Sequence, residues 1–223
     1  MASAVKGSGA EAAVPASRGT RDAEATKKAI LAAAVQEFAG RGLAGARVED
    51  IGKRAGCNLR MIYYYFGNKE GLYVAALEKV YDDFVEAEKA LDLDSMTAVD
   101  GILRMISFTW HYFREHPEFV SLLNTENMHG ARFARQSRRI SSGADPQLQL
   151  VESVLRKGVK EGVFRPEVAV FETHVTIVSL CYFYLSNRAT MSNYLGRDMT
   201  SEGACDTWLT HVSQVVLASL VRR

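Results

Sequence analysis

The sequence predicts an all-α fold in which three short N-terminal helices precede a larger helical body. Apolar residues recur at three- and four-residue spacing from about residue 26 onward, and no segment shows the period-two alternation of a β-strand. Pro117, Pro146 and Pro166 stand at expected helix starts, which is the position that a helix tolerates best. Residues 1–22 are rich in Ala, Gly and Ser and have no periodic apolar face, so we expect a disordered tail there.

The first helix is expected to begin at Thr26, because Ile30, Ala34 and Phe38 follow at four-residue intervals on one face. A Gly-Arg-Gly stretch at 40–42 favours a left-handed helix end. The helix should therefore stop there.

Two short helices come next, over residues 48–55 and 59–66, joined by a tight turn. Gly56 permits the turn, and Asn58 is a good N-cap for the second helix, whose Ile62 and Phe66 face inward. This arrangement is a helix-turn-helix unit, which places its second helix in the major groove of DNA. Longer helices are expected to form the body, over residues 69–91, 96–115, 118–129, 146–162, 168–188 and 201–221.

Charge is distributed unevenly along the chain. The formal net charge is +1, but residues 18–69 carry ten Lys or Arg against five Asp or Glu, and residues 70–223 carry a net charge of −4. A basic head on an acidic body is expected when only the head meets phosphate.

The residues from 48 to 72, which read VEDIGKRAGCNLRMIYYYFGNKEGL, resemble the motif of the tetracycline-repressor family of transcriptional regulators. The most specific part is the aromatic run at 63–66 followed by Asn68-Lys69-Glu70 and Leu72. The resemblance implies a homodimer that binds a palindromic double-stranded DNA operator and responds to a small-molecule effector without a cofactor. Repression is the usual mode, and activation stays open. We therefore divide the chain into a tail (1–22), a helix-turn-helix DNA-binding domain (23–69) and a helical ligand-binding and dimerisation domain (70–223).

Leu59, Arg60 and Tyr63 are expected to read base edges, because they lie on the outward face of the second short helix. Arg60 can bind guanine through two hydrogen bonds, Leu59 can pack on a thymine methyl, and Tyr63 can contact a methyl or a phosphate. The alternative for Arg60 is a solvated surface arginine.

Contacts to the DNA backbone are expected from Tyr64, Lys69 and Arg47. Lys69 opposes the dipole of the helix that it begins, and the resemblance implies that a DNA phosphate offsets this cost. The alternative is a local pair with Glu70 or Glu78. In the tail, Arg18 and Arg21 are interpreted as solvated, with a minor-groove arm as the alternative.

Three positions depart from the family pattern. Met61 stands where a small hydroxyl residue is common, so it cannot supply the hydroxyl for a phosphate contact. Gly71 stands where an acid is common, and Cys57 where valine is common. We interpret Cys57 as a small apolar filler of the turn, with redox sensing as the alternative.

The resemblance implies dimerisation through the last two helices. The helix at 168–188 is apolar on more than one side, which fits a helix with two partners, and the alternative is a fully buried helix in a monomer. Helices between about 96 and 188 are expected to enclose the effector. Polar residues among aromatic ones are the candidate lining: Trp110, Phe113, Asn124, Glu126, Asn127, His174 and Tyr182.

Other classes of protein find little support in the sequence. Three widely spaced cysteines and five histidines without ligand spacing predict no metal site, and no Gly-rich phosphate loop, GxSxG or paired-carboxylate motif predicts an enzyme. Without a signal peptide or a membrane-length apolar run, the protein is expected to be cytoplasmic. The alternatives are a ligand-independent architectural DNA-binding protein and a small-molecule enzyme with an incidental helix-turn-helix.

Overall fold

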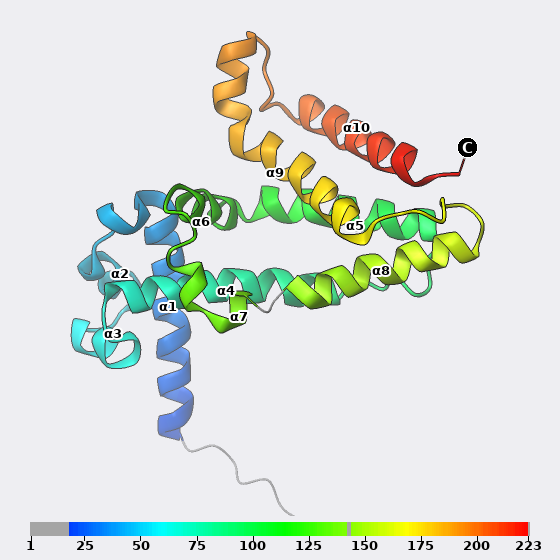
Figure 1. The fold of residues 1–223 in the computed structure, drawn as a ribbon. Helices are drawn as coiled ribbons and strands as arrows, with labels where there is room; N and C mark the ends of the chain where they lie inside the picture. Colours follow the sequence, from blue (N-terminus) through cyan, green and yellow to red (C-terminus); the bar gives the residue numbers. More distant parts are fainter. Residues whose placement is uncertain (1–17, 142–143, 223) are drawn as a thin grey trace, which may run out of the picture.

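The computed structural model describes residues 18–141 and 144–222, and every regular element within them is helical (Figure 1). An isolated antiparallel bridge joins Phe164 to Val221. The elements in chain order are α1 (Arg18–Gly45), α2 (Val48–Ala55), α3 (Leu59–Phe66), α4 (Lys69–Lys89), α5 (Ala98–Glu115), α6 (Pro117–Met128), η1 (Ala134–Gln136), α7 (Arg138–Ser141), α8 (Ala144–Lys160), α9 (Val170–Leu195) and α10 (Glu202–Leu220).

The first helix differs from the expectation at its start. It begins at Arg18 rather than at Thr26, so the expected disordered tail is wrong for residues 18–22, and residues 1–17 lie outside the described part of the chain. The glycine stretch does interrupt the helix, because Gly42 has φ 65° and ψ 174°. A residue with a Cβ rarely adopts that conformation, and the chain turns there toward α2.

The two short helices lie where the sequence predicts them. Gly56 ends α2 in the left-handed conformation with φ 66°, and the Asn58 side chain accepts a hydrogen bond from the Met61 N–H at 3.0 Å to begin α3. Ile51 and Ile62 are fully buried between α1, α2 and α3. These contacts fix the angle of α3 on the head.

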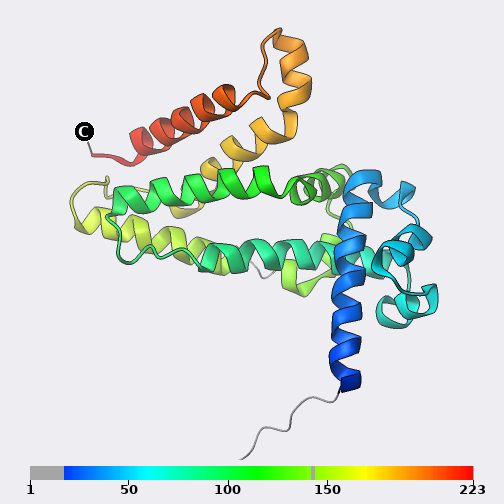
Figure 2. The ribbon, with the colours of Figure 1, turned by 180° about the vertical axis from the view of Figure 1, so that it is seen from behind.

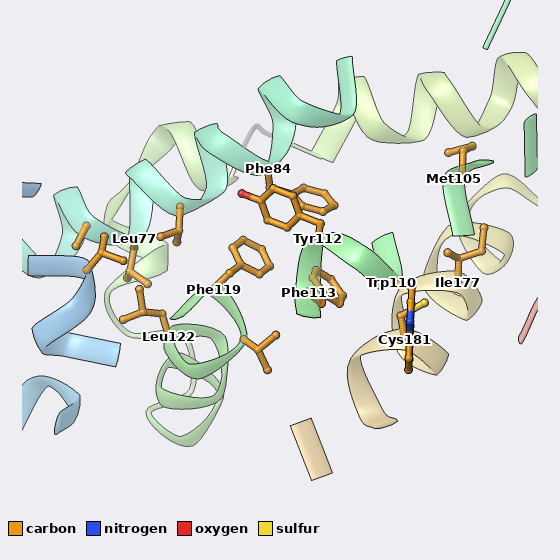
Figure 3. Close-up of a cluster of buried hydrophobic side chains, with 14 of the residues drawn as sticks. Leu77, Phe84, Met105, Trp110, Tyr112, Phe113, Phe119, Leu122, Ile177 and Cys181 are labelled. Carbon is orange, nitrogen blue, oxygen red and sulfur yellow. The ribbon is translucent and has the colours of Figure 1, made fainter. Parts of the chain in front are cut away.

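The body packs around a cluster of aromatic rings contributed by α4, α5 and α6 (Figure 3). The ring centroids of Phe84, Phe113 and Phe119 lie 5.5–5.9 Å apart in stacked pairs. Trp110 and Cys181 bury the contact between α5 and α9 beside them. Phe113, one of the residues that the sequence offered as effector lining, is part of this ring cluster.

Two parts of the body were not predicted. The elements η1 and α7 form a short segment between α6 and α8, which we call the strap (residues 130–141), and Figure 1 shows it beside α4. The helix α9 continues to Leu195, beyond the expected end at residue 188. Figure 2 shows from behind that α9 and α10 form one edge of the body, while α1 crosses its other end.

Candidate nucleic-acid interface

The outward face of α3 presents Arg60, Tyr63 and Tyr64, whereas Leu59, which the sequence placed on the same face, packs against the hydrophobic core. Arg60 is exposed, Tyr63 and Tyr64 are 45% and 82% exposed, and Leu59 is half-buried at the start of the helix. Tyrosine side chains have an apolar ring and a polar hydroxyl, so an exposed tyrosine can make both kinds of contact with a partner. A guanidinium and two phenols on one short helix suit hydrogen bonds to base edges and phosphates.

The close approach of α2 and α3 depends on a glycine. A Cβ at Gly52 would lie 3.2 Å from the Cys57 carbonyl oxygen and 3.5 Å from Ile62 Cδ1. Burial raises the pKa of the Cys57 thiol, which disfavours the reactive thiolate and agrees with its interpretation as a filler of the turn.

A buried carboxylate that the sequence analysis missed organises the head. Glu37 on α1 is 3% exposed, and its Oε1 accepts a hydrogen bond from the Arg47 N–H at 3.4 Å. Arg41 Nε lies 3.4 Å from Glu37 Oε1, and Arg54 Nη2 lies 3.6 Å from Oε2. Glu37 therefore links α1, α2 and the turn between them, and it leaves the exposed Arg47 side chain at the surface. The four-residue spacing of Glu37 and Arg41 was the available signal.

Lys69 makes a contact that neither alternative had predicted. Its Nζ donates a hydrogen bond to the Ala44 carbonyl at the end of α1, at 3.3 Å. The expected partners are engaged elsewhere, because Glu70 lies 3.8 Å from Arg132 and Glu78 accepts from Ser137. Lys69 thus ties the first turn of α4 to the end of α1, and its ammonium lies at the junction of the two helices.

The glycine at position 71 has a steric reason. A Cβ there would lie 2.3 Å from the Phe66 carbonyl oxygen, which is closer than real Cβ contacts come. The Gly71 N–H also donates to the Asn68 side chain at 2.7 Å. The sharp turn between α3 and α4 therefore excludes the acidic side chain that the family pattern has at this position.

Two family models match the chain. The model described as "Bacterial regulatory proteins, tetR family" matches residues 30–76, and "Tetracyclin repressor-like, C-terminal domain" matches residues 99–216, which is more than half of the chain. The chain belongs to the tetracycline-repressor family. It is a helix-turn-helix transcriptional regulator, as the sequence predicted.

One relative matches nearly the whole chain, and another matches about half of it. The HTH-type transcriptional repressor NicS of Pseudomonas putida is 38% identical over 202 residues, which are 91% of this chain and 95% of NicS. The HTH-type transcriptional regulator RutR of Escherichia coli K12 is 34% identical over 112 residues, about half of each chain (50% and 52%).

Solved structures share the fold. A TetR transcriptional regulator from Chloroflexus aurantiacus aligns with a TM-score of 0.68 at 19% identity, over 91% of this chain and 100% of that one. The regulator FadR from Bacillus subtilis, solved in complex with stearoyl-CoA, aligns with a TM-score of 0.64 at 20% identity, over 86% and 98%. The all-α prediction is confirmed.

The expected pocket residues of this family member lie in packed regions. Trp110 is fully buried and its Nε1 has no hydrogen-bond partner, while Phe113 is 3% exposed within the aromatic cluster. His174 is half-buried on α9, and burial lowers its pKa. Contact between these residues and an effector stays a prediction.

Three of the expected residues meet in one polar cluster between α6 and α9. The Tyr182 hydroxyl donates to Asn124 Oδ1, and Asn127 Nδ2 donates to the Tyr182 oxygen at 3.4 Å. Ser186, which the sequence analysis did not select, donates to Asn124 Oδ1 at 3.2 Å. The cluster therefore bonds α6, which packs on the head helix α1 through Ser121, to α9.

Glu126 contacts the strap, and its expected contact with an effector stays a prediction. Its side chain is 5% exposed, and Oε2 accepts hydrogen bonds from the backbone N–H groups of Phe133 at 3.1 Å and Ala134 at 2.9 Å. Oε1 and the buried Tyr73 hydroxyl have no partner within hydrogen-bond geometry. Glu126 thus anchors the strap to α6.

A cavity of about 550 Å³ opens between α4, α7 and α8, and none of the expected pocket residues lines it. Its walls are formed by Tyr81, Asp82, Val85, Glu86, Lys89, Arg139, Ile140, Pro146 and Gln147. In the described ranges, no three His, Cys, Asp or Glu side chains gather as a metal would need. None of the described helices has the length and apolar character of a bilayer crossing.

Proposed function

We propose that this protein is a cytoplasmic repressor that binds a palindromic operator as a homodimer and leaves it when a small molecule occupies the body. The observation that carries the proposal is the exposed Arg60, Tyr63 and Tyr64 face of α3, on a head held by the buried Glu37. The name of the relative NicS as a repressor supports the same direction of control.

Base contacts are assigned to Leu59, Arg60 and Tyr63, and phosphate contacts to Tyr64, Lys69 and Arg47. Arg60 has the fork geometry that pairs with guanine O6 and N7. Lys69 is the first residue of α4, and its Nζ lies at the junction with the end of α1. Backbone N–H groups at the start of a helix also favour an anion.

The exposed apolar side chains support a dimer through α9 and α10. Five of the large apolar side chains that remain exposed in the described chain lie on α9: Phe171, Val175, Phe183, Tyr194 and Leu195. Phe171, Val175 and Phe183 lie away from the side of α9 that packs inside the chain, whereas Leu195 follows Ile177 by five turns and lies on that packed side near the end of the helix. The packed side contains Ile177, Cys181 and Tyr184. A second copy on the open side would place the two heads in successive major grooves, roughly 34 Å apart.

We propose that the dimer has two forms that differ in the distance between the heads, and that the effector binds one of these forms more tightly than the other. A ligand shifts the dimer away from its operator-bound form only if it binds the other form more tightly. The helix α4 supplies the connection, because it begins beside the Lys69 phosphate site and ends at the wall of the cavity.

The test is fluorescence anisotropy with DNA from upstream of the protein's own and neighbouring genes, at two salt concentrations. Arg60→Ala should lose about 1–3 kcal/mol of operator binding and become less selective. Lys69→Ala should weaken all sequences equally and lower the salt slope by about one. Arg156→Ala and Lys160→Ala, exposed on α8, are the matched controls. If the wild-type protein selects no sequence, the proposed function is wrong.

A further inference from the structure

The cavity between α4, α7 and α8 combines apolar walls with charged groups. Tyr81 and Val85 lie one turn apart on α4, and Ile140 and Pro146 face them from α7 and α8. At about 550 Å³ the space has the size of a small-molecule site. An apolar body of ligand size can therefore cover part of its surface against these walls.

Each of the two acidic side chains in the cavity wall, Asp82 and Glu86, forms an ion pair with a basic side chain of the protein. The Arg139 guanidinium pairs with the Asp82 carboxylate, and Lys89 Nζ lies 2.8 Å from Glu86 Oε1. The Arg139 and Asp82 side chains are 64% and 42% exposed, so water and solutes reach the pair. An ion pair this open contributes at most about 1 kcal/mol, which a competing cation can overcome.

Charge favours a cationic competitor over an anionic one. Residues 78–89 of α4 carry five acids and two lysines, and four of the acids remain if Glu88, which burial favours in its neutral form, is left out. An anion would have to remove Arg139 from Asp82 while lying against this negative helix, whereas a cation gains from the same field. The ring of Tyr81 is a further surface that attracts cations.

We propose that this cavity binds a small organic cation with an apolar body, of the amidinium or guanidinium class, which replaces Arg139 on Asp82. The inference rests on the proposed function, because it assigns the effector site and class of that same regulator. A planar amidinium can make the paired hydrogen bonds to a carboxylate that a guanidinium makes. The apolar body then packs on Val85, Ile140 and Pro146.

Displacement of Arg139 reaches the DNA-binding head through the strap. From Arg139 toward the head, Ser137 Oγ donates to Glu78 Oε1 at 2.6 Å and Phe133 packs edge-to-face on Tyr73 with centroids 5.2 Å apart. Arg132 lies 3.8 Å from Glu70, the residue next to Lys69. The strap therefore runs along α4 from the cavity wall to the phosphate site, and release of its cavity end loosens this brace.

The experiment measures binding of benzamidinium and of its isosteric anion benzoate to the full chain by calorimetry, without DNA. We expect saturable binding of benzamidinium and at least about 10-fold weaker binding of benzoate. Asp82→Asn should weaken benzamidinium by about 10-fold, since the charged acceptor is lost. Arg139→Gln should strengthen it by up to about 5-fold, since the internal competitor is gone.

The opposite directions separate a ligand site from a structural effect. Both variants break the same ion pair, so a purely structural consequence would move benzamidinium affinity in the same direction. Asp94→Asn, an exposed acid outside the cavity with the same charge change, is the control and should bind like the wild type. Thermal melts verify that each variant is folded.

Two results would overturn the inference. The first is that neither the wild type nor Arg139→Gln binds benzamidinium saturably. The second is that benzoate binds as tightly as benzamidinium. Operator anisotropy on the same samples separates this outcome from failure of the regulator itself. A protein that selects its operator but ignores benzamidinium refutes the site alone, whereas one that selects no operator refutes the proposed function.

Discussion

A buried acid on α4 makes the stability of this protein depend on pH in an unusual direction. Glu88 is 5% exposed, and burial raises its pKa from 4.5 to about 7, although a hydrogen bond with Gln147 acts in the opposite sense. The folded protein therefore holds a proton on Glu88 that the unfolded chain has lost by neutral pH. We predict that Glu88→Gln, which keeps the shape without the charge, removes this dependence.

The magnitude follows from the two pKa values. A carboxyl whose pKa is higher in the folded state stabilises least at high pH, so this contribution falls as pH rises from about 4.5 to about 7 and is constant above that. The difference of the two values corresponds to roughly 3 kcal/mol. Glu88→Gln should therefore gain up to about 3 kcal/mol over the wild type between pH 4.5 and pH 8.

Urea denaturation at pH 4.5, 6 and 8 measures this difference. All samples have the same protomer concentration, because the stability of an oligomer depends on that concentration. The control is Glu86→Gln, since Glu86 lies two residues away with a side chain that is 72% exposed. Its free energy of unfolding should follow the wild type at each pH. Parallel pH profiles for the wild type and Glu88→Gln would refute the reasoning, because they would mean that the Glu88 pKa is the same in the folded and unfolded chain.

Three further predictions concern the head, the core and the dimer. Asn58→Ala removes the N-cap of α3 and should cost about 1 kcal/mol in urea unfolding, together with weaker operator binding; an unchanged midpoint would contradict this. Gly158→Ala should lower the free energy of unfolding by about 1–3 kcal/mol, because the new Cβ would lie 2.0 Å from the Phe164 ring. In the control Gly203→Ala the new Cβ meets nothing within 4 Å, so the free energy of unfolding should match or exceed that of the wild type. Phe183→Glu places a charge on the exposed side of α9 and should shift the protein to monomer in sedimentation velocity; a stable dimer would place the interface elsewhere.

The head could be predicted from the sequence because its determinants are local. Gly56 and Asn58 each act within a few residues through backbone conformation and capping, so α2 and α3 were found at their observed bounds. The exposure of Arg60 and Tyr64 followed from the helical period once Ile62 was assigned to the core. The family motif covers these same residues.

The body required the tertiary structure, because its decisive contacts join residues far apart in the chain. The strap has little periodic pattern, and Glu126 holds it through the backbone N–H groups of Phe133 and Ala134 at the start of the short helix η1. Phe84, Phe113 and Phe119 come from three helices, and only their packing shows that Phe113 is part of a ring cluster.

The sequence by itself therefore determined the family, the helical fold and the exposure of Arg60, Tyr63 and Tyr64 on α3, since capping and periodicity act over one or two turns. Only the tertiary structure decided where the body has a cavity and which charged side chains meet in its wall. That depends on Asp82 and Arg139, which lie 57 positions apart and meet only when the strap packs on α4.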